Sequence, residues 1–410
     1  MKNLRLEPLQ SEGPIDAGAE EELFRDLGRQ AAAEVLSRRW ESAGAGSVGR
    51  CPDCGTQLRD LGLRGKRFQT LCGTVQLQRR MGYCNQCHAT TATLDERLGA
   101  NDTGITPGLQ RVICRVALEM AYEPTKALLK DTLGFSPCSS REIERIANRH
   151  GKEIEIRLEM SSPAGKRPRA KKVYCVAIDG TMIPGLPDPK DHRLIWHEVK
   201  LATVIDASDI DAPFYVASTE KAEAFGLKLW RALDTRGMDP KNLAQVIADG
   251  APWIWNLADL HFPGVTQLLD FYHAAEHLHQ TAAALWPEGI ANAWWHRRLE
   301  QLKAGELGNF FAALKLIAKR RTTSDPAVSP ERLLQYFEEN RKRLGYAEAL
   351  NRNLPIGSGV VESAGRHIVQ QRLKQSGMRW SLAGAQAILN LRTRHRNGQF
   401  EQYWENYAAA

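Results

Sequence analysis

Residues 173–181 have the sequence VYCVAIDGT, in which six apolar residues are followed by Asp179-Gly180-Thr181. A short apolar run that ends in a turn dipeptide predicts a buried strand. Two more strands are expected at 194–205 and 214–218, followed by a helix at 220–234. After them we expect a strand at 243–248 before Asp249-Gly250, a helix near 253–260, and a strand at 265–269 before Asp270. This order of elements predicts a mixed α+β domain.

The same order is found in ribonuclease-H-like folds, whose first three strands form an antiparallel meander. A crossover helix after the third strand would bring the fourth strand parallel to the first and beside it. Asp179 and Asp249 would then lie side by side. Two neighbouring carboxylates repel each other unless a cation lies between them, which favours a magnesium site. The alternative is two unrelated turns, because Asp-Gly is a common turn dipeptide.

A third carboxylate should complete a two-metal site, and Glu362 is the preferred candidate. It lies in residues 355–363, PIGSGVVES, where a loop is expected to lead into a helix. An acid in the first turn of a helix is favoured by the helix dipole. That helix would place Arg366, Val369 and Leu373 on the face of Glu362. The alternative is an ordinary acid at a helix N-terminus.

The chain carries further short motifs in a fixed order: IDGT at 178–181, ADGA at 248–251, DFYH at 270–273, GSGVVES at 357–363, RLK at 372–374 and GMRWS at 377–381. Together these motifs resemble bacterial insertion-sequence transposases of the ISKra type, which belong with the Mutator-like DDE group. The resemblance covers most of residues 50–407. It implies a catalytic triad of Asp179, Asp249 and Glu362. It also implies a helical insertion, expected at about 281–350 with breaks at 287, 305–308 and 324–330.

The resemblance implies an enzyme that cleaves the ends of its element and joins them to target DNA. Mg²⁺ or Mn²⁺ would be the cofactor. Double-stranded DNA, both the terminal repeats and the target, would be the partner. Two protomers would pair on the two ends of the element. The expected location is the bacterial cytoplasm, in association with the nucleoid. Asp270 and His273 would support the active site, although Asp270 or Glu276 is a rival to Glu362 as metal ligand. A DNA-binding regulator without chemistry and a ribonuclease-H-like nuclease remain alternative functions.

Five of the eight cysteines lie within residues 51–87, and four of them form two CxxC pairs with 29 residues between the pairs. In a reducing compartment, paired CxxC units are typical of zinc sites, because each turns tightly enough to direct two thiolates at one ion. The intervening sequence predicts strands at 67–72 and 74–79 with a turn at Gly73. Residues 48–98 are therefore interpreted as a zinc ribbon, with Cys72 and His88 as spare candidates. The expected zinc ligands are Cys51, Cys54, Cys84 and Cys87.

Helical segments flank this ribbon. Residues 1–47 predict a helical arm, and residues 99–160 predict three helices, at 106–121, 124–133 and 139–159. These three helices could form a helix-turn-helix that binds DNA or a simple packing bundle. Residues 161–172 contain two prolines and five basic residues, and are expected to be a linker that tracks a DNA backbone through Lys166, Arg167 and Arg169. The catalytic domain would span residues 173–410.

The charge distribution supports a polyanionic partner. The formal net charge is +7, and residues 363–400 alone contain seven Arg or Lys and no acid. No apolar run approaches the 18 residues of a membrane helix, so a soluble intracellular protein without membrane partners is expected. The eight basic residues of the ribbon also fit DNA, or they could offset the negative charge of four thiolates on zinc. The expected phosphate contacts in the C-terminal segment are Arg366, Arg372, Lys374, Arg379, Arg392, Arg394 and Arg396.

Overall fold

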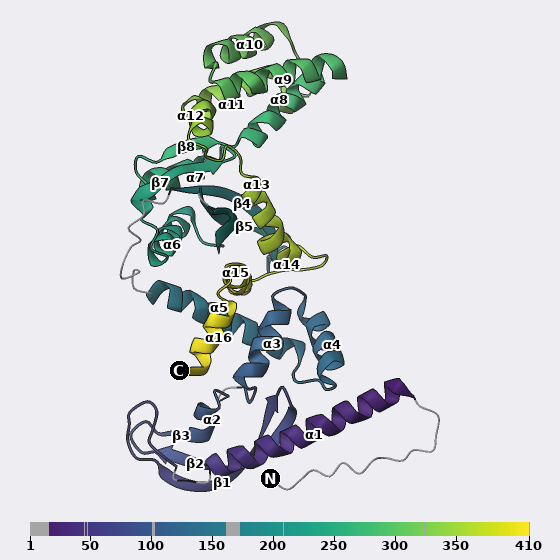
Figure 1. Ribbon diagram of the computed structural model, residues 1–410, viewed down its shortest axis with the longest axis vertical. Coiled ribbons are helices and arrows are strands. Elements are labelled where there is room, and N and C mark those ends of the chain that lie inside the picture. The colour runs from purple at the N-terminus through teal and green to yellow at the C-terminus, as the bar shows by residue number, and fades with distance from the viewer. Residues whose placement is uncertain are drawn as a thin grey trace. The chain divides into compact units, whose positions relative to one another are not determined.

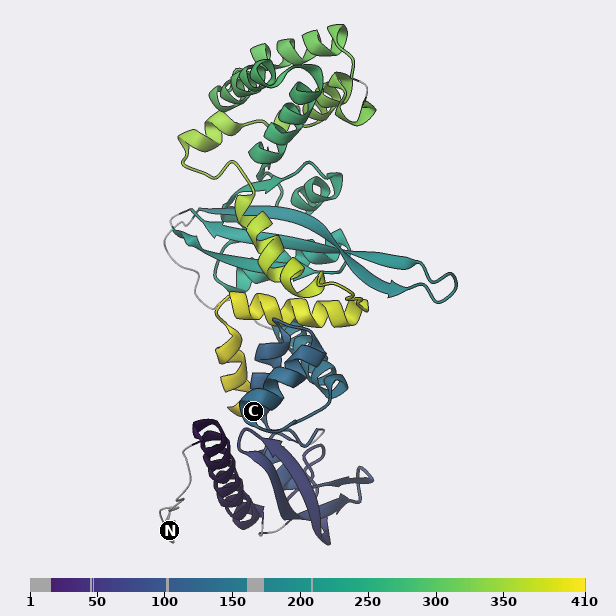
Figure 2. The same cartoon turned by 90° about the vertical axis from the view of Figure 1, so that its right-hand side faces the viewer.

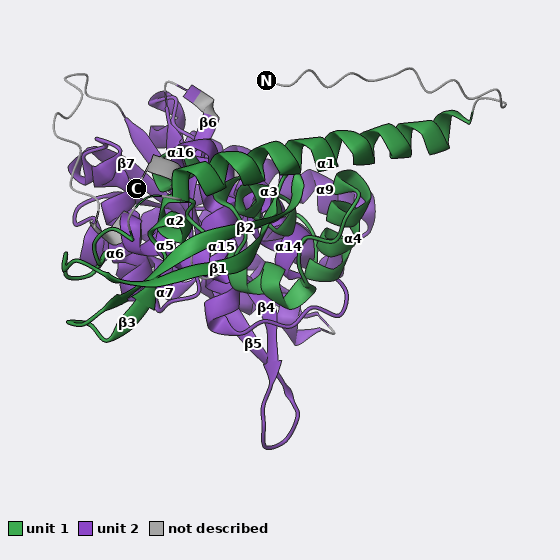
Figure 3. Cartoon of the chain, turned by 90° about the horizontal axis from the view of Figure 1, so that it is seen from below, with its two compact units in different colours: residues 1–146, 404–410 green, residues 147–403 purple. Residues whose placement is uncertain are grey.

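The computed structural model describes residues 16–44, 46, 48–100, 103–160, 173–207, 209–323 and 325–409. The chain forms two compact units, one of residues 1–146 and 404–410 and one of residues 147–403 (Figure 3). The expected linker at 161–172, with Lys166, Arg167 and Arg169, lies outside the described residues. Within the described ranges, no helix has both the length and the apolar character needed to cross a membrane.

The first unit begins with α1 (Ala17–Gly44) and a three-stranded antiparallel sheet of β1 (Arg59–Thr70), β2 (Gly73–Cys84) and β3 (Ala89–Thr91). The hairpin turn consists of Leu71 and Cys72, which the sequence predicted to be strand, and Gly73, the expected turn, begins β2. Both strands are longer than expected. β2 alternates buried and exposed residues, so one face packs on a small core around Phe68 and Leu77. Trp40 of α1 packs against this core.

Four helices follow: α2 (Thr93–Arg97), α3 (Pro107–Ala117), α4 (Tyr122–Leu133) and α5 (Ser140–Met160). The last three match the predicted helices within a few residues. Pro107 occupies the first turn of α3, and Gly134 ends α4 with a left-handed φ of 74°. The predicted cap of α5 is a capping box, in which Ser139 N–H donates to Glu142 Oε2 at 2.9 Å.

The second unit contains a five-stranded sheet in the order β6-β5-β4-β7-β8. The strands are β4 (Tyr174–Pro187), β5 (Leu194–Asp206), β6 (Asp209–Ser218), β7 (Leu243–Ala248) and β8 (Thr266–Leu269). β4, β5 and β6 are antiparallel, whereas β7 is parallel to β4 and β8 to β7. The crossovers contain α6 (Ala222–Thr235), η1 (Pro240–Asn242) and α7 (Pro252–His261). The expectation that the fourth strand lies parallel beside the first is confirmed.

The centre of this sheet is buried on both faces. Consecutive residues of β4 are buried from Tyr174 to Ile178, so side chains on either face are covered. The sequence predicted that this strand would end before Asp179. Instead, β4 continues to Pro187, because its residues keep pairing with β5. Figure 2 shows the two strands extending as a hairpin beyond the rest of the sheet.

A helical insertion separates β8 from the C-terminal elements (Figure 1). It comprises α8 (Phe271–Leu285), α9 (Glu288–Ala304), α10 (Leu307–Arg320), η2 (Pro326–Val328), α11 (Pro330–Glu339), η3 (Arg341–Arg343) and α12 (Tyr346–Asn351). The three predicted helix breaks are confirmed. The chain then forms α13 (Gly359–Ala364), the π-helical turn η4 (Gly365–Gln370), α14 (Gln371–Leu373), α15 (Leu382–Arg396) and α16 (Phe400–Ala409).

Candidate zinc centre and carboxylate site

The two CxxC pairs converge beside the three-stranded sheet. All four sulfur atoms lie within 4.8 Å of one another. Cys54 Sγ is 3.4 Å from Cys84 Sγ, and Cys51 Sγ is 3.9 Å from Cys87 Sγ. A tetrahedral zinc ion with Zn–S bonds of about 2.3 Å spaces its sulfur ligands about 3.8 Å apart. The four cysteines therefore fit a zinc ion, whereas Cys72 and His88 are not members of the cluster.

Part of the ribbon's basic charge is used inside the unit. Asp95 is buried and accepts from Lys66 Nζ and from Arg79 Nε, both at 2.7 Å. Arg80 pairs with Asp60 at 2.6 Å on the surface. Lys66 and Arg79 hold the hairpin to α2, and Arg80 joins the two strands of the hairpin. The basic composition of residues 48–98 therefore overstates the charge that this surface offers to DNA.

Asp179 and Asp249 hold equivalent positions on neighbouring parallel strands. Ala177 of β4 pairs with Ile247 of β7, and each aspartate follows its paired residue by two positions. Asp249 comes directly after β7, whereas Asp179 lies inside β4, at the point where pairing with β7 has ended. A backbone N–H fixes one oxygen of each carboxylate, from Gly180 to Asp179 at 2.7 Å and from Ala251 to Asp249 at 3.0 Å.

The charges of Asp249 and Glu362 act on the carboxylate of Asp179. Burial raises the pKa of Asp179, and the negative charges of Asp249 and Glu362 raise it further, while the Gly180 N–H and His273 oppose the shift. Such mutual repulsion is relieved by a cation. The three are not drawn into one tight ligand set, because the cysteine group is the only one in the described part of the chain whose ligand atoms all lie within 4.8 Å.

Glu362 lies in the first turn of α13, as predicted, and is exposed. The helix changes to π-helical geometry three residues later, at Gly365. Such π turns are frequent at functional sites. The expectation that Val369 and Leu373 share the face of Glu362 is wrong, because both are fully buried, and the wider turn shifts the faces that a regular helix would align.

Asp270 is 1% exposed and uses both carboxylate oxygens in the protein. Oδ1 accepts from His273 N–H at 2.9 Å and so caps α8, while Oδ2 accepts from Ser358 N–H at 2.5 Å. The neighbouring Phe271 N–H donates to Ile356 O at 3.0 Å. Asp270 thus joins the start of the insertion to the loop before α13. Its engaged oxygens make it a positioning residue, and the rival assignment as metal ligand does not suit it.

The same loop needs glycine at position 357. A side chain on Gly357 would collide with the ring of Tyr272 in α8. This close approach lets the loop run directly over the start of the insertion, which fixes where α13 begins. It gives a physical reason for glycine in the GSGVVES motif.

A histidine and tyrosine cluster lies beside Asp249. Tyr336 of α11 donates its hydroxyl to Asp249 O at 3.1 Å. The rings of His273 and His277 are 4.7 Å apart, and His277 is 4.5 Å from the ring of Tyr336. Burial and then the charge of His273 lower the pKa of His277. Tyr336 could not be identified from the sequence, since only a contact across 87 residues brings α11 to Asp249.

The expected phosphate contacts separate into two groups. Arg372 and Arg392 are buried, which contradicts a role in phosphate binding. Arg372 lies over the Trp380 ring at 4.9 Å, and Arg392 Nε donates to Ile368 O at 2.8 Å. Both hold the C-terminal helices together. Arg366, Lys374, Arg379 and Arg396 are exposed, and Arg394 is half-buried. Of these, Lys374 lies beside the segment that carries Asp179, because its Nζ donates to Thr181 Oγ1 at 2.7 Å.

Comparisons with known proteins give little further guidance. No protein-family model matches this chain, and no curated protein matches it. Among solved structures, it is similar to a Drosophila P element transposase strand transfer complex, with 12% sequence identity and a TM-score of 0.28. That match covers 77% of this chain and 84% of the other. A TM-score at this level does not establish a common fold, so the functional interpretation depends on the residues of the chain itself.

Proposed function

We propose that this protein is a DDE transposase of the ISKra type, related to the Mutator-like group, which cleaves the ends of its insertion sequence and joins them to target DNA. Residues 173–410 would form its ribonuclease-H-like catalytic domain. The strand order β6-β5-β4-β7-β8, with three antiparallel strands followed by two parallel ones, supports this fold. The zinc ribbon and the helices of the first unit would contribute DNA or protein contacts.

The observation that carries the proposal is the electrostatic coupling of three carboxylates from distant segments. Asp179 is partly buried, and the charges of Asp249 and Glu362 both raise its pKa. Holding like charges together destabilises a fold unless they serve a cation. Their positions in the IDGT, ADGA and GSGVVES motifs match the catalytic acids of the family that the sequence resembles.

Asp179, Asp249 and Glu362 would hold Mg²⁺ or Mn²⁺. Such ions, when bound, lower the pKa of a water or a 3′-hydroxyl and stabilise the leaving oxygen of a phosphodiester. The protein's own part is to orient the carboxylates: backbone N–H groups fix Asp179 and Asp249, and Asp270 fixes the loop before Glu362. Lys374, held beside Thr181 on β4, would contact the phosphate backbone.

The test uses the full chain with DNA that carries its own element ends, with magnesium and with EDTA. Nicking and strand transfer are expected only with the divalent ion. Asp179→Asn, Asp249→Asn and Glu362→Gln should each lower the rate on the order of a thousandfold, since metal-assisted charge stabilisation is worth several kcal/mol. Glu288→Gln, an exposed acid on α9, is the control and should retain activity. Glu276→Gln tests the rival ligand and should also remain active.

Each contrary result has a definite meaning. Wild-type rates from Asp249→Asn or Glu362→Gln would contradict the catalytic assignment. Loss of activity in Glu276→Gln with full activity in Glu362→Gln would favour the rival ligand. Specific binding of the ends without any cleavage would identify a DNA-binding regulator. Cleavage of RNA in RNA–DNA hybrids, with no action on element ends, would identify a ribonuclease-H-like nuclease.

A further inference from the structure

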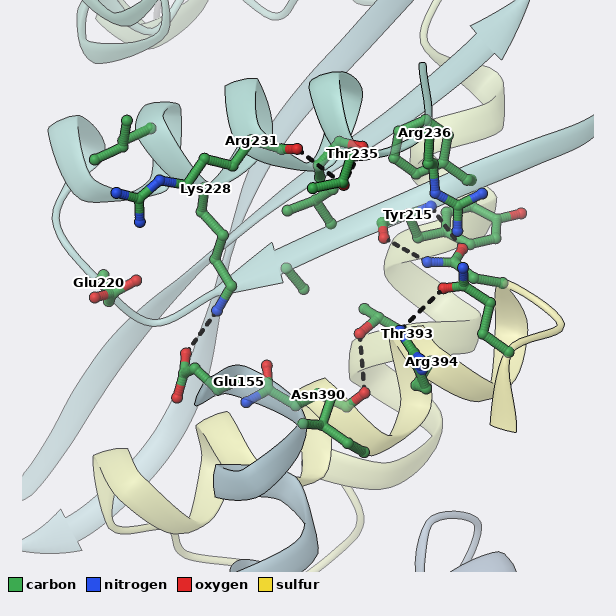
Figure 4. A pocket seen from close by; sticks show the side chains of 18 of the residues that line it. Glu155, Tyr215, Glu220, Lys228, Arg231, Thr235, Arg236, Asn390, Thr393 and Arg394 are labelled. Atoms are coloured by element: carbon green, nitrogen blue, oxygen red, sulfur yellow. Dashed lines mark hydrogen bonds and ion pairs between the residues drawn. The ribbon is translucent and has the colours of Figure 1, made fainter. Parts of the chain in front are cut away.

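A cavity of about 410 Å³ lies in the second unit, away from the motifs that carry the proposed catalysis (Figure 4). It is lined by α6, the edge strand β6, the C-terminal half of α15 and part of α5, and by none of the three proposed catalytic carboxylates. Its volume is in the range of pockets that hold small organic ligands. Nothing in the proposed reaction uses this cavity.

The cavity is lined by four cations, of which one is paired with an acid. Lys228 Nζ lies 2.7 Å from Glu155 Oε1. The other acid, Glu220, accepts from the Ser218 hydroxyl at 3.0 Å. Among the residues that the structure describes, the remaining three cations form no ion pair with a carboxylate. Those three are Arg231, Arg236 and Arg394.

Arg236 and Arg394 lie close enough to repel each other. The guanidinium of Arg236 is 4.3 Å from the centre of the Phe214 ring. Burial lowers the pKa of Arg236, and the positive charge of Arg394 lowers it further. Arg394 Nε is buried and has no hydrogen-bond partner among the residues that the structure describes. An anion with several acceptor oxygens would offset the repulsion and accept from the accessible atoms of the two guanidinium groups.

The rest of the lining is part polar, with Asn390, Thr393 and Asn397, and part apolar. The apolar lining residues include Val216 of β6 and Ala224, Leu227 and Ala232 of α6. An inorganic anion would leave this part of the space without a partner. A ligand that fits the whole cavity therefore has an anionic head for the arginines and a less polar body.

We propose that this cavity binds a small phosphorylated organic molecule of mononucleotide size, with its phosphate on Arg236 and Arg394. Phosphate suits these residues because guanidinium groups bind its oxygens in pairs. A DNA backbone offers the same chemistry, but its phosphates lie on a convex surface, whereas these arginines line a cavity. The proposal is independent of the proposed transposition chemistry.

The test measures binding of a nucleoside monophosphate, of inorganic phosphate and of a short DNA duplex without element ends to the full chain, by calorimetry. The nucleotide should bind more tightly than inorganic phosphate. Arg236→Gln and Arg394→Gln should each weaken it by about tenfold to a hundredfold, the loss expected for a charge-assisted hydrogen bond. Arg320→Gln, an exposed arginine at the end of α10, is the matched control and should change nothing.

A second variant tests the apolar body without changing charge. Leu227 is 42% exposed, so Leu227→Trp should fold and partly fill the cavity. It should abolish nucleotide binding and leave the circular dichroism spectrum unchanged. Nucleotide binding that survives both Arg236→Gln and Leu227→Trp would overturn the proposal. So would equal affinity for inorganic phosphate, or arginine-dependent binding of the duplex with none of the nucleotide.

Discussion

The buried carboxylate of Asp270 accepts a hydrogen bond of 2.5 Å from the backbone N–H of Ser358, four residues before Glu362. Its other oxygen caps α8 at His273. One side chain therefore fixes both ends of the helical insertion, which begins at α8 and returns to the sheet just before α13. This helps to explain how Glu362, 183 residues beyond Asp179 in sequence, comes close enough for its charge to raise the pKa of Asp179.

Asp270→Ala should make the loop before α13 more mobile and should also lower the free energy of unfolding. It removes a helix cap and a buried charge-assisted hydrogen bond, a loss of about 2–4 kcal/mol. Urea unfolding should measure that loss, and hydrogen exchange should show faster exchange at Ser358 and in α13. Asp325→Ala removes an exposed cap of η2 and serves as the control, with a smaller loss and no change in α13. Unchanged exchange in α13 of the Asp270 variant would contradict the positioning role.

The sequence predicts the parts of the fold that depend on local pattern. The strand at 243–248 is found with the predicted bounds, because an apolar run followed by Asp-Gly specifies both its burial and its end. The continuation of β4 was missed. Its residues 182–187, MIPGLP, include two prolines and a glycine, and they are kept extended by pairing with β5 and by a bridge from Gly185 to Trp380.

The residues of the candidate site are likewise of two kinds, those that a local motif indicates and those that only tertiary contacts bring in. Asp179, Asp249 and Glu362 could be selected because each lies in a short motif. Tyr336 could not, since nothing near it in sequence indicates a contact with Asp249. The burial of Arg372 could not be predicted either, because arginine is rarely buried and only the packed Trp380 explains it.

The carboxylate cluster should make stability depend on pH and magnesium. The pKa of Asp179 is raised in the folded state, so its contribution is fully present below its unfolded pKa of about 4 and is lost as pH rises through the folded pKa. Asp249→Asn removes one repelling charge. Without divalent ions it should raise the unfolding free energy at pH 7 on the order of 1 kcal/mol, and the gain should vanish below about pH 4.

With magnesium, the wild type should instead be more stable than Asp249→Asn, since the ion stabilises the intact carboxylate cluster more than it stabilises the variant. Urea unfolding at several pH values, with EDTA or with magnesium, measures both effects. Asp259→Asn, an exposed acid on α7, is the control and should show neither. A variant that is less stable than wild type at pH 7 in EDTA would show that Asp249 is not under repulsion.

The first unit should require zinc in order to fold, and each chain should bind one zinc ion. Cys54→Ser or Cys87→Ser removes a ligand and should release the ion. Zinc binding contributes roughly 10–16 kcal/mol in small zinc domains, so residues 48–98 should then become sensitive to proteases. Metal analysis and limited proteolysis measure these outcomes. Cys72→Ser, which lies outside the cluster, should retain full zinc, and loss of zinc in that variant would change the ligand set.

Two arginines seven residues apart should behave differently. Arg372 is fully buried over Trp380, and Nη1 donates to Met378 Sδ at 3.1 Å, so Arg372→Ala should lower the unfolding free energy by about 2–5 kcal/mol. Arg379 is exposed, and Arg379→Gln should leave stability within about 0.5 kcal/mol of wild type.

DNA binding separates the two roles. If Arg379 contacts a phosphate, its loss should reduce the slope of log affinity against log salt by about 1, with a similar effect on every DNA sequence. Arg372→Ala, measured at a temperature where it remains folded, should keep the wild-type slope. Binding titrations at four salt concentrations, paired with urea unfolding, measure both quantities. A reduced salt slope for Arg372→Ala, together with wild-type stability, would show that Arg372 contacts DNA phosphates. A side chain that only packs cannot change the number of phosphates that the protein neutralises.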